Sequence, residues 1–485
     1  MTRFSKIDIL LGAVICAAAL LTFLQTANFP FVPFTDAVCF LPQAVKFAQG
    51  EGLRNVYQFT YLPDGAFVWH GFLLPLVLGG VFGTDTYIKV SFVLAVLNAA
   101  NVLLLGATLV RFTTNWKPIS RWIFLTLCLL AQVGFLQGVL GRPETLSSLL
   151  IACGLLAWSF RPSVAVYIFL GLLTGLLAVT SPAPAVFAAG FLVAAVLVRE
   201  ERIAAVLKVG AILAVAALAA VALAFQFYPY SLAQWVWGLQ QHANAVLKDT
   251  TGPLTLNLLL QRFVIFSGRF ASGLVFASIW VVAVTYVWRA GRQRPVQSYI
   301  AIAIVFLVGL AVMRIALQGQ FYYLLCLFPL AAGVAAVALH TGNACGPALR
   351  FGLLAMLALS SLDPLLLQAG RLLGYTGLPL PQARRLFAED FKDLPGKVAV
   401  SMDLAALSDT TDRLEVLYGY VPPCKEPDTD WLVAQQYCFF YAEPPTYANF
   451  KLVKNRFAAK QKLPGRLSQW FGVNGYGYAV YERVR

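Results

Sequence analysis

The stretch AAVLKVGAILAVAALAAVALAFQF, residues Ala204 to Phe227, holds a single charged side chain. As a helix rising 1.5 Å per residue, it is long enough to cross a hydrocarbon core of about 30 Å. Apolar runs of about twenty residues recur along the chain, separated by short basic or Gly/Pro breaks. The runs lack a two-residue alternation, which excludes a transmembrane barrel. The sequence therefore predicts a polytopic helical membrane protein.

The composition of the 485 residues agrees with this interpretation. Hydrophobic residues make up 59% and charged residues 12% of the chain, whereas soluble domains are about half apolar and a quarter charged. A water-soluble globule is therefore excluded. The net charge of +14 also occurs in nucleic-acid-binding proteins, but those cluster Lys and Arg on a soluble face. Here many basic residues lie between apolar runs, so the charge indicates membrane topology.

The apolar runs give eleven spans. The first, Ile7 to Ala27, is longer than the apolar core of a signal peptide and lacks a small-residue cleavage site, so we interpret it as an uncleaved anchor with a cytoplasmic N-terminus. The other ten are residues 85–110, 122–140, 146–160, 164–180, 185–198, 204–227, 270–288, 298–317, 321–339 and 351–367.

The positions of Lys and Arg test this count, because cytoplasmic loops carry most of them. The loops assigned to the inside hold basic clusters at 111–121, 199–208 and 289–294. The apolar stretch 66–83 contains Pro75 and a Gly pair, and counting it as a span would place the first cluster outside. We therefore interpret that stretch as an interfacial or re-entrant segment packed against protein.

The last part of the chain reads as a separate domain. Residues 1–370 form the transmembrane domain, and residues 371–485 have the mixed charge of soluble sequence and are placed on the extracytoplasmic side. Candidate strands occur at 397–402, 431–433 and 478–484. They predict a small α/β domain. Cys424 and Cys438 lie within it on the oxidising side, so a disulfide or two unpaired thiols both stay open.

The placement of polar groups indicates where chemistry occurs. A channel or carrier usually places ionisable groups in the middle of its membrane spans. The predicted spans of this chain hold few ionisable residues at those positions. Polar residues collect in the external loops and at the outer ends of the helices. We therefore expect a cavity at the outer membrane surface.

The first external loop carries the main catalytic candidate. Apolar residues recur there at three- and four-residue steps from Phe40 to Ala48, which predicts an amphipathic helix in the interface plane. Asp36 directly precedes it. A carboxylate in this place suits a general base that acts on a polar acceptor. The alternative is that Asp36 only caps the helix.

A second candidate is Gly141-Arg142-Pro143-Glu144, between two spans on the outer side. The planar guanidinium of Arg142 can bind a lipid phosphate. The alternatives are interfacial snorkelling or a pair with Glu144. Lys89, Arg269 and Arg314 also lie near outer helix ends. Together these cations could line a pocket for an anionic headgroup.

Two further motifs are weaker. The outer loop 228–268 contains Trp235-Val236-Trp237 and Gln240-Gln241-His242, which suit a sugar but also an ordinary interfacial aromatic belt. Asp428-Thr429-Asp430 spells a metal-chelating DxD, yet it leads into a predicted strand and is discounted. No His/Cys cluster has zinc spacing. We therefore predict neither a metal nor a cofactor.

Several stretches together suggest a family. They are Asp36, Phe40, Ala44, Gly50, Tyr57, Phe59 to Pro63, Pro75-Leu76, Gly141 to Leu146, Gly171 to Leu176, Gln320 to Leu325 and Phe328 to Leu330. With these motifs the sequence resembles polyprenyl-phosphate-sugar-dependent glycosyltransferases of the C-type fold (GT-C). The resemblance is strongest to glycosyltransferase families 39 and 87, which are mannosyltransferase- or arabinosyltransferase-like membrane enzymes.

The resemblance implies a fold and a function. The fold is an all-α polytopic GT-C-like bundle with interfacial helices in the first external loop and a C-terminal extracytoplasmic α/β domain. The reaction transfers a sugar from a polyprenyl-phosphate donor to an envelope glycan, lipid or protein, at a bacterial plasma membrane and without nucleic acid. The alternative is a flippase or transporter of a lipid-linked saccharide.

The resemblance also implies residue roles. Asp36 is the base that deprotonates the acceptor hydroxyl. Many family 39 relatives have a second acidic residue after this Asp, whereas this chain has Ala37, which favours a metal-free, single-base inverting transfer. The remaining roles are donor phosphate binding for Arg142, Arg314, Lys89 and Arg269, and acceptor or sugar binding for Glu144, Tyr61 and His242.

Overall fold

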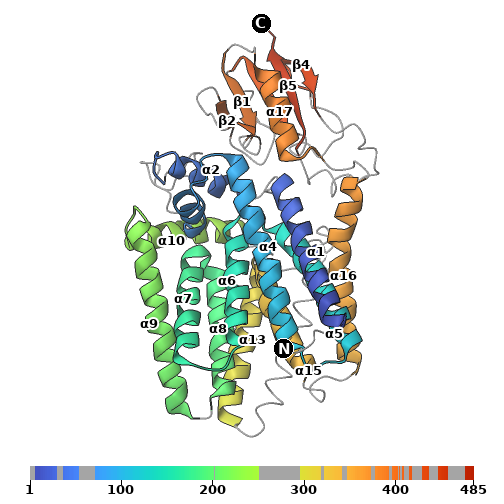
Figure 1. Cartoon of the computed structure of the whole chain (residues 1–485). Helices are drawn as coiled ribbons and strands as arrows, with labels where there is room; N and C mark the ends of the chain where they lie inside the picture. The colour runs from blue at the N-terminus through green and yellow to red at the C-terminus, as the bar shows by residue number, and fades with distance from the viewer. Residues whose placement is uncertain are drawn as a thin grey trace.

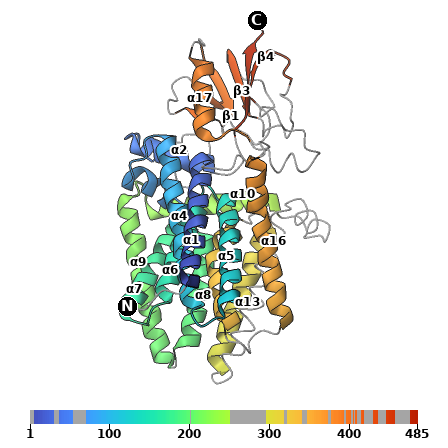
Figure 2. The same cartoon turned by 45° about the vertical axis from the view of Figure 1, so that its right-hand side comes forward.

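The computed structural model describes most of the helical part of the chain and the core of the C-terminal domain. The described residues are 6–29, 37–53, 71–200, 202–250, 295–317, 322–340, 347–372, 377–392, 396–401, 404, 407–408, 414–417, 429–435, 446–456 and 476–484. Figures 1 and 2 show a bundle of helices with a small sheet domain at one end. The chain begins near the opposite end of the bundle.

The bundle consists of apolar helices of different lengths. They are α1 (Lys6–Asn28), α4 (Tyr87–Phe112), α5 (Pro118–Gly138), α6 (Pro143–Trp158), α7 (Val164–Thr180), α8 (Pro182–Arg199), α9 (Ile203–Phe227), α13 (Pro295–Leu317), α14 (Tyr322–Cys326), α15 (Phe328–His340) and α16 (Pro347–Leu372). Among the described residues, five helices, α1, α4, α5, α8 and α9, are long and apolar enough to cross a membrane. This supports a multi-pass membrane protein. The predicted span 270–288 lies outside the described residues, so the count of eleven stays a prediction.

One predicted span is divided in the structure. The run 321–339 forms two helices, α14 and α15, that are separated at Leu327. Pro329 has no N–H to donate to the carbonyl oxygen one turn earlier, and proline is tolerated in the first turn of a helix, where α15 begins. The predicted span is therefore interrupted at Leu327.

Small residues bring α7 and α9 together. Gly171 and Gly175 of α7 are four residues apart and both face α9. A Cβ atom at Gly171 would lie 2.6 Å from the carbonyl oxygen of Leu213, and one at Gly175 would overlap the carbonyl oxygen of Ala217. Small residues at this spacing let helix backbones approach closely in a membrane. Packing of α7 on α9 therefore accounts for both glycines of the 171–176 stretch.

Short helices cover the end of the bundle nearest the sheet domain (Figure 1). They are α2 (Ala37–Ala48), α3 (Leu73–Leu76), the π-helix η1 (Val77–Val81) and α10 (Leu232–Thr250). α2 buries Phe40, Leu41, Ala44 and Val45, as the predicted amphipathic helix requires. α3 and η1 are too short to cross a membrane and pack on α2, which agrees with the interfacial interpretation of this stretch. α10 occupies a region expected to be a loop.

The C-terminal domain is a five-stranded mixed sheet with one helix. The elements are α17 (Leu380–Phe391), β1 (Val398–Ser401), β2 (Leu414–Leu417), β3 (Trp431–Gln435), β4 (Phe450–Asn455) and β5 (Tyr478–Arg483). The strand order is β2-β1-β3-β5-β4. β1 pairs in parallel with β2 and β3, whereas β5 pairs antiparallel with β3 and β4. The three predicted strands are confirmed, while β2 and β4 were not predicted.

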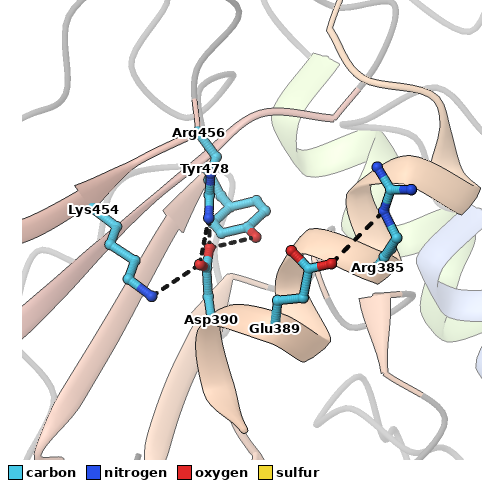
Figure 3. Close-up of polar contacts among 6 residues, drawn as sticks. All are labelled: Arg385, Glu389, Asp390, Lys454, Arg456 and Tyr478. Carbon is cyan, nitrogen blue, oxygen red and sulfur yellow. Dashed lines mark hydrogen bonds and ion pairs between the residues drawn. The ribbon is translucent and has the colours of Figure 1, made fainter.

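A buried carboxylate ties α17 to the sheet (Figure 3). Asp390 on α17 accepts hydrogen bonds from Lys454 Nζ at 3.0 Å, Arg456 Nη2 at 2.7 Å and Tyr478 Oη at 3.0 Å. Burial alone would raise the pKa of Asp390, but these three donors outweigh it and hold the pKa below 3.8. The Asp390 cluster, meaning these four residues, therefore fixes the helix on the strands.

Candidate functional site

The turn from α5 to α6 lies at the end of the bundle nearest the sheet domain. Gly141 has φ +72, a left-handed conformation that residues with a side chain rarely adopt. Arg142 then takes an extended N-cap conformation, Pro143 begins α6, and Glu144 lies in the first turn. A carboxylate is favourable there, because the N-terminus of a helix carries a partial positive charge. This local geometry directs both ionisable side chains toward the same place.

Arg142 and Glu144 form a buried ion pair. Arg142 Nε donates to Glu144 Oε2 at 3.0 Å, and only 3% and 0% of the two side chains are exposed. Ser181, in the turn between α7 and α8, donates its hydroxyl to Glu144 Oε1 at 3.1 Å. The structure thus shows the pair that was one alternative for this motif. The pair joins the beginning of α6 to the beginning of α8.

Neutral polar residues are also buried inside the bundle, on helices α1, α4, α5 and α6. Gln132 Nε2 on α5 donates to Asn101 Oδ1 on α4 at 2.9 Å and to Ser148 Oγ on α6 at 3.2 Å. Asn98 Nδ2 donates to Thr26 Oγ1 on α1 at 3.2 Å. All five residues are fully buried. We call them, together with Gln25, the amide track.

Sequence reasoning missed the amide track because it looked only for ionisable groups in mid-span. Several amide atoms of the track have no hydrogen-bond partner among the described residues, namely Asn98 Oδ1, Asn101 Nδ2, Gln132 Oε1 and both amide atoms of Gln25. Buried polar atoms almost always pair in proteins. The track therefore suits hydroxyl groups of a ligand or ordered water.

Two other predicted residues can be placed. Lys89 Nζ lies 2.8 Å from Asp85 on the surface, at the beginning of α4. It is not part of the buried pair. Trp235 on α10 packs edge-on against Phe72 and Phe225 at 5.8 and 5.7 Å between ring centroids. Packing thus accounts for this tryptophan, as the aromatic-belt alternative expected.

The remaining candidates cannot be described in full. Asp36, Tyr61, Arg269, Cys424 and Cys438 lie outside the described residues, and for Arg314 on α13 and His242 on α10 only the backbone is described. α2 begins at Ala37, so chain continuity places Asp36 immediately before it. In the part of the chain that is described, no three His, Cys, Asp or Glu side chains are grouped so that they could hold a metal ion.

Comparisons with known proteins give one distant likeness. No family model and no curated protein matches the chain. A solved structure similar to it is that of the arabinofuranosyltransferase AftD from Mycobacteria, with a TM-score of 0.44 and 18% sequence identity. The match covers 86% of this chain and 32% of the other, so the chain spans about a third of that structure's length. A likeness this distant does not assign the chain to a family.

Proposed function

We propose that the chain is a membrane glycosyltransferase of the C-type fold. It transfers a sugar from a polyprenyl-phosphate donor to an envelope glycan, lipid or protein on the extracytoplasmic side. The observation that carries the proposal is the buried Arg142–Glu144 pair at the end of the bundle where the interfacial elements lie. Gly71, two residues before α3, packs on Pro143, the residue between Arg142 and Glu144 in the sequence. α3 in turn packs on α2. The beginning of α2, which Asp36 precedes in the sequence, therefore lies at the same end of the bundle as the Arg142–Glu144 pair.

The chemistry requires few protein groups. A lipid-linked sugar carries its own phosphate leaving group, so the enzyme must position two substrates, remove one proton and stabilise a phosphate. Asp36 acts as the general base toward the acceptor hydroxyl. Arg142 and Arg314 bind the donor phosphate, while Lys89 and Arg269 add positive charge. Tyr61 and His242 contact the sugar or the acceptor.

Glu144 has an orienting role in this proposal. It is fully buried and accepts hydrogen bonds from Arg142 and Ser181, which favours holding the guanidinium over direct contact with a sugar. A guanidinium carries five N–H donors in a fixed plane, so it can bind a carboxylate and a phosphate together. Fixing that plane in advance avoids reorganisation when the leaving group develops charge.

The test is transfer by purified protein in vesicles that contain a radiolabelled polyprenyl-phosphate sugar and an envelope extract as acceptor. Asp36→Asn keeps the size of the side chain and removes the base, so we expect transfer to fall by about a hundredfold or more. Glu51→Gln, which changes an exposed carboxylate that pairs with Lys46 on α2, is the matched control and should retain transfer. Full activity of Asp36→Asn would contradict the assignment.

A specific observation supports the alternative, a flippase or transporter for a lipid-linked saccharide. The amide track places buried neutral polar groups among α1, α4, α5 and α6, where a carrier needs polar sites. A transporter would move a fluorescent lipid-linked sugar between the leaflets of a liposome without sugar transfer. Asn101→Leu should then stop movement, whereas in a glycosyltransferase Asp36→Asn stops transfer.

A further inference from the structure

A cavity lies away from the Arg142–Glu144 pair. Its volume is about 430 Å³, within the range of small-ligand pockets. Helices α6, α7, α8, α13 and α15 supply most of the lining, which is largely aliphatic and aromatic, and Leu155, Phe191 and Val305 are typical. The hydroxyl of Thr174, one of its few polar groups, is engaged with the carbonyl oxygen of Leu170 at 2.8 Å. The cavity therefore suits a hydrocarbon chain.

One cation contributes to the lining of this cavity. Among the described lining residues only Arg199 is charged. Its guanidinium lies over the ring of Trp158, 4.6 Å from the centroid. Both residues end their helices, α8 and α6, at the end of the bundle opposite the sheet domain. A cation held by an aromatic face beside an apolar cavity matches an amphiphile with an anionic headgroup.

The size of the cavity favours one short chain. A volume of about 430 Å³ lies in the range of pockets that hold one small ligand. One acyl chain of a phospholipid suits a pocket of this size, whereas a polyprenyl tail is far longer. Two glycines, Gly154 and Gly333, contribute to the lining, and their missing side chains leave room among the larger residues.

We propose that this cavity binds one acyl chain of an anionic phospholipid from the leaflet opposite the sheet domain, with the lipid phosphate at Arg199. The occupant is a structural lipid of the surrounding membrane. It differs from the sugar donor, because Arg199 lies at the other end of the bundle from Arg142. The inference therefore does not depend on the proposed function.

The test measures which lipids stay bound to the full-length protein. The protein is placed in nanodiscs made from equal amounts of phosphatidylglycerol and phosphatidylcholine, released into detergent and analysed by native mass spectrometry. We expect wild type to retain one phosphatidylglycerol in preference to phosphatidylcholine. Arg199→Gln should lower that preference by about tenfold, because a charge-assisted contact to phosphate is lost.

A second variant fills the cavity. A Cβ atom at Gly154 would meet Leu170 and Leu173 at 3.7 and 3.8 Å, which is ordinary contact, so the larger side chain of Gly154→Leu occupies part of the cavity without a clash at the backbone. We expect it to reduce retention of both lipids by about tenfold. Gly210→Leu is the matched control, since that glycine lies on α9 with nothing within 4 Å of a Cβ.

Three outcomes would overturn the proposal. The first is equal retention of both lipids by wild type, and the second is unchanged retention in both Arg199→Gln and Gly154→Leu. The third is displacement of phosphatidylglycerol by a polyprenyl phosphate added to the same nanodiscs, because the cavity would then belong to the donor. Should Gly154→Leu fail to fold, Arg199→Gln still decides the charge requirement.

Discussion

Glu144 and Asp390 are both buried carboxylates that accept hydrogen bonds from an arginine, but their surroundings differ. Glu144 lies inside the helical bundle, where 3% of the Arg142 side chain and none of the Glu144 side chain is exposed. Asp390 lies in the sheet domain, where 43% of the Lys454 side chain and 34% of the Arg456 side chain remain exposed. The cations of the domain can therefore return to water if the carboxylate is lost.

The two clusters also differ in how the chain assembles them. Arg142 and Glu144 are two residues apart and meet through one tight turn. Asp390 meets partners that are 64, 66 and 88 residues away. The Arg142–Glu144 pair is thus a local contact without access to water, whereas the Asp390 cluster is a long-range contact whose cations are partly exposed to solvent. Loss of each should therefore change the free energy of unfolding by a different amount.

The largest effect is expected for Arg142→Met. Removing the arginine leaves Glu144 buried without its ion-pair partner, which typically costs about 3–5 kcal/mol. The double variant Arg142→Met/Glu144→Met removes both charges and should recover most of that stability, since well-packed apolar residues often replace a buried pair at little cost. Thermal unfolding in detergent measures both variants.

Measuring sugar transfer by the same variants distinguishes a stabilising role of Arg142 from a role in binding the donor phosphate. If Arg142 binds the donor phosphate, the double variant should be stable yet inactive. A double variant that regains both stability and transfer would show that the pair only holds α6 in place. A double variant as unstable as Arg142→Met would contradict the ion-pair argument itself.

The next effect is expected for Asp390→Asn. The charged acceptor is lost, and hydrogen bonds to charged groups contribute about 1.5–3 kcal/mol each, but Lys454 and Arg456 regain water. We expect a net loss of about 2 kcal/mol in the stability of the sheet domain. Hydrogen exchange of the β4 and β5 amides in the full-length protein should become faster, while exchange in α4 and α6 stays unchanged. Equal acceleration in the bundle would contradict independent clusters.

The sequence was sufficient to predict the features that depend on neighbouring residues. Apolar length located α4, α7 and α9 within a few residues, and three- and four-residue apolar steps located α2. The Arg142–Glu144 pair was recognised as an alternative because a short motif contains both partners. The sequence pattern is sufficient to predict a contact when the two interacting residues lie within one turn of the chain.

Features that depend on distant contacts were not predictable. β4 reads FKLVKN, and only its first residue is buried, so the sequence lacks the alternation that marks a strand. The partners of Asp390 lie in β4, directly after β4 and in β5, far along the chain, and no spacing rule in the sequence connects them. The amide track was missed because only ionisable groups were sought in mid-span, and its contact between Asn101 and Gln132 joins two different helices.

Acidification should break the Asp390 cluster. The folded pKa of Asp390 is lowered, so the cluster's contribution is fully present above the ordinary carboxyl pKa of about 4 and is lost as pH falls through the lowered value. Exchange protection of β4 and β5 should therefore fall below about pH 4. Asp390→Asn serves as the reference, because its protection should lack this component. An identical acid profile in the two proteins would exclude Asp390 as the group that titrates.

The smallest effect is expected for Arg385→Gln, one turn from Asp390 on the same helix. Arg385 Nε lies 3.8 Å from Glu389 Oε1, and 70% and 59% of the two side chains are exposed (Figure 3). Exposed pairs of this kind contribute about 0–0.5 kcal/mol, because water screens the charges and holding two long side chains costs entropy. Exchange of the β4 and β5 amides should match wild type at low and at high salt. A loss as large as that of Asp390→Asn would mean that charge on α17, and not burial of one carboxylate, holds the helix on the sheet.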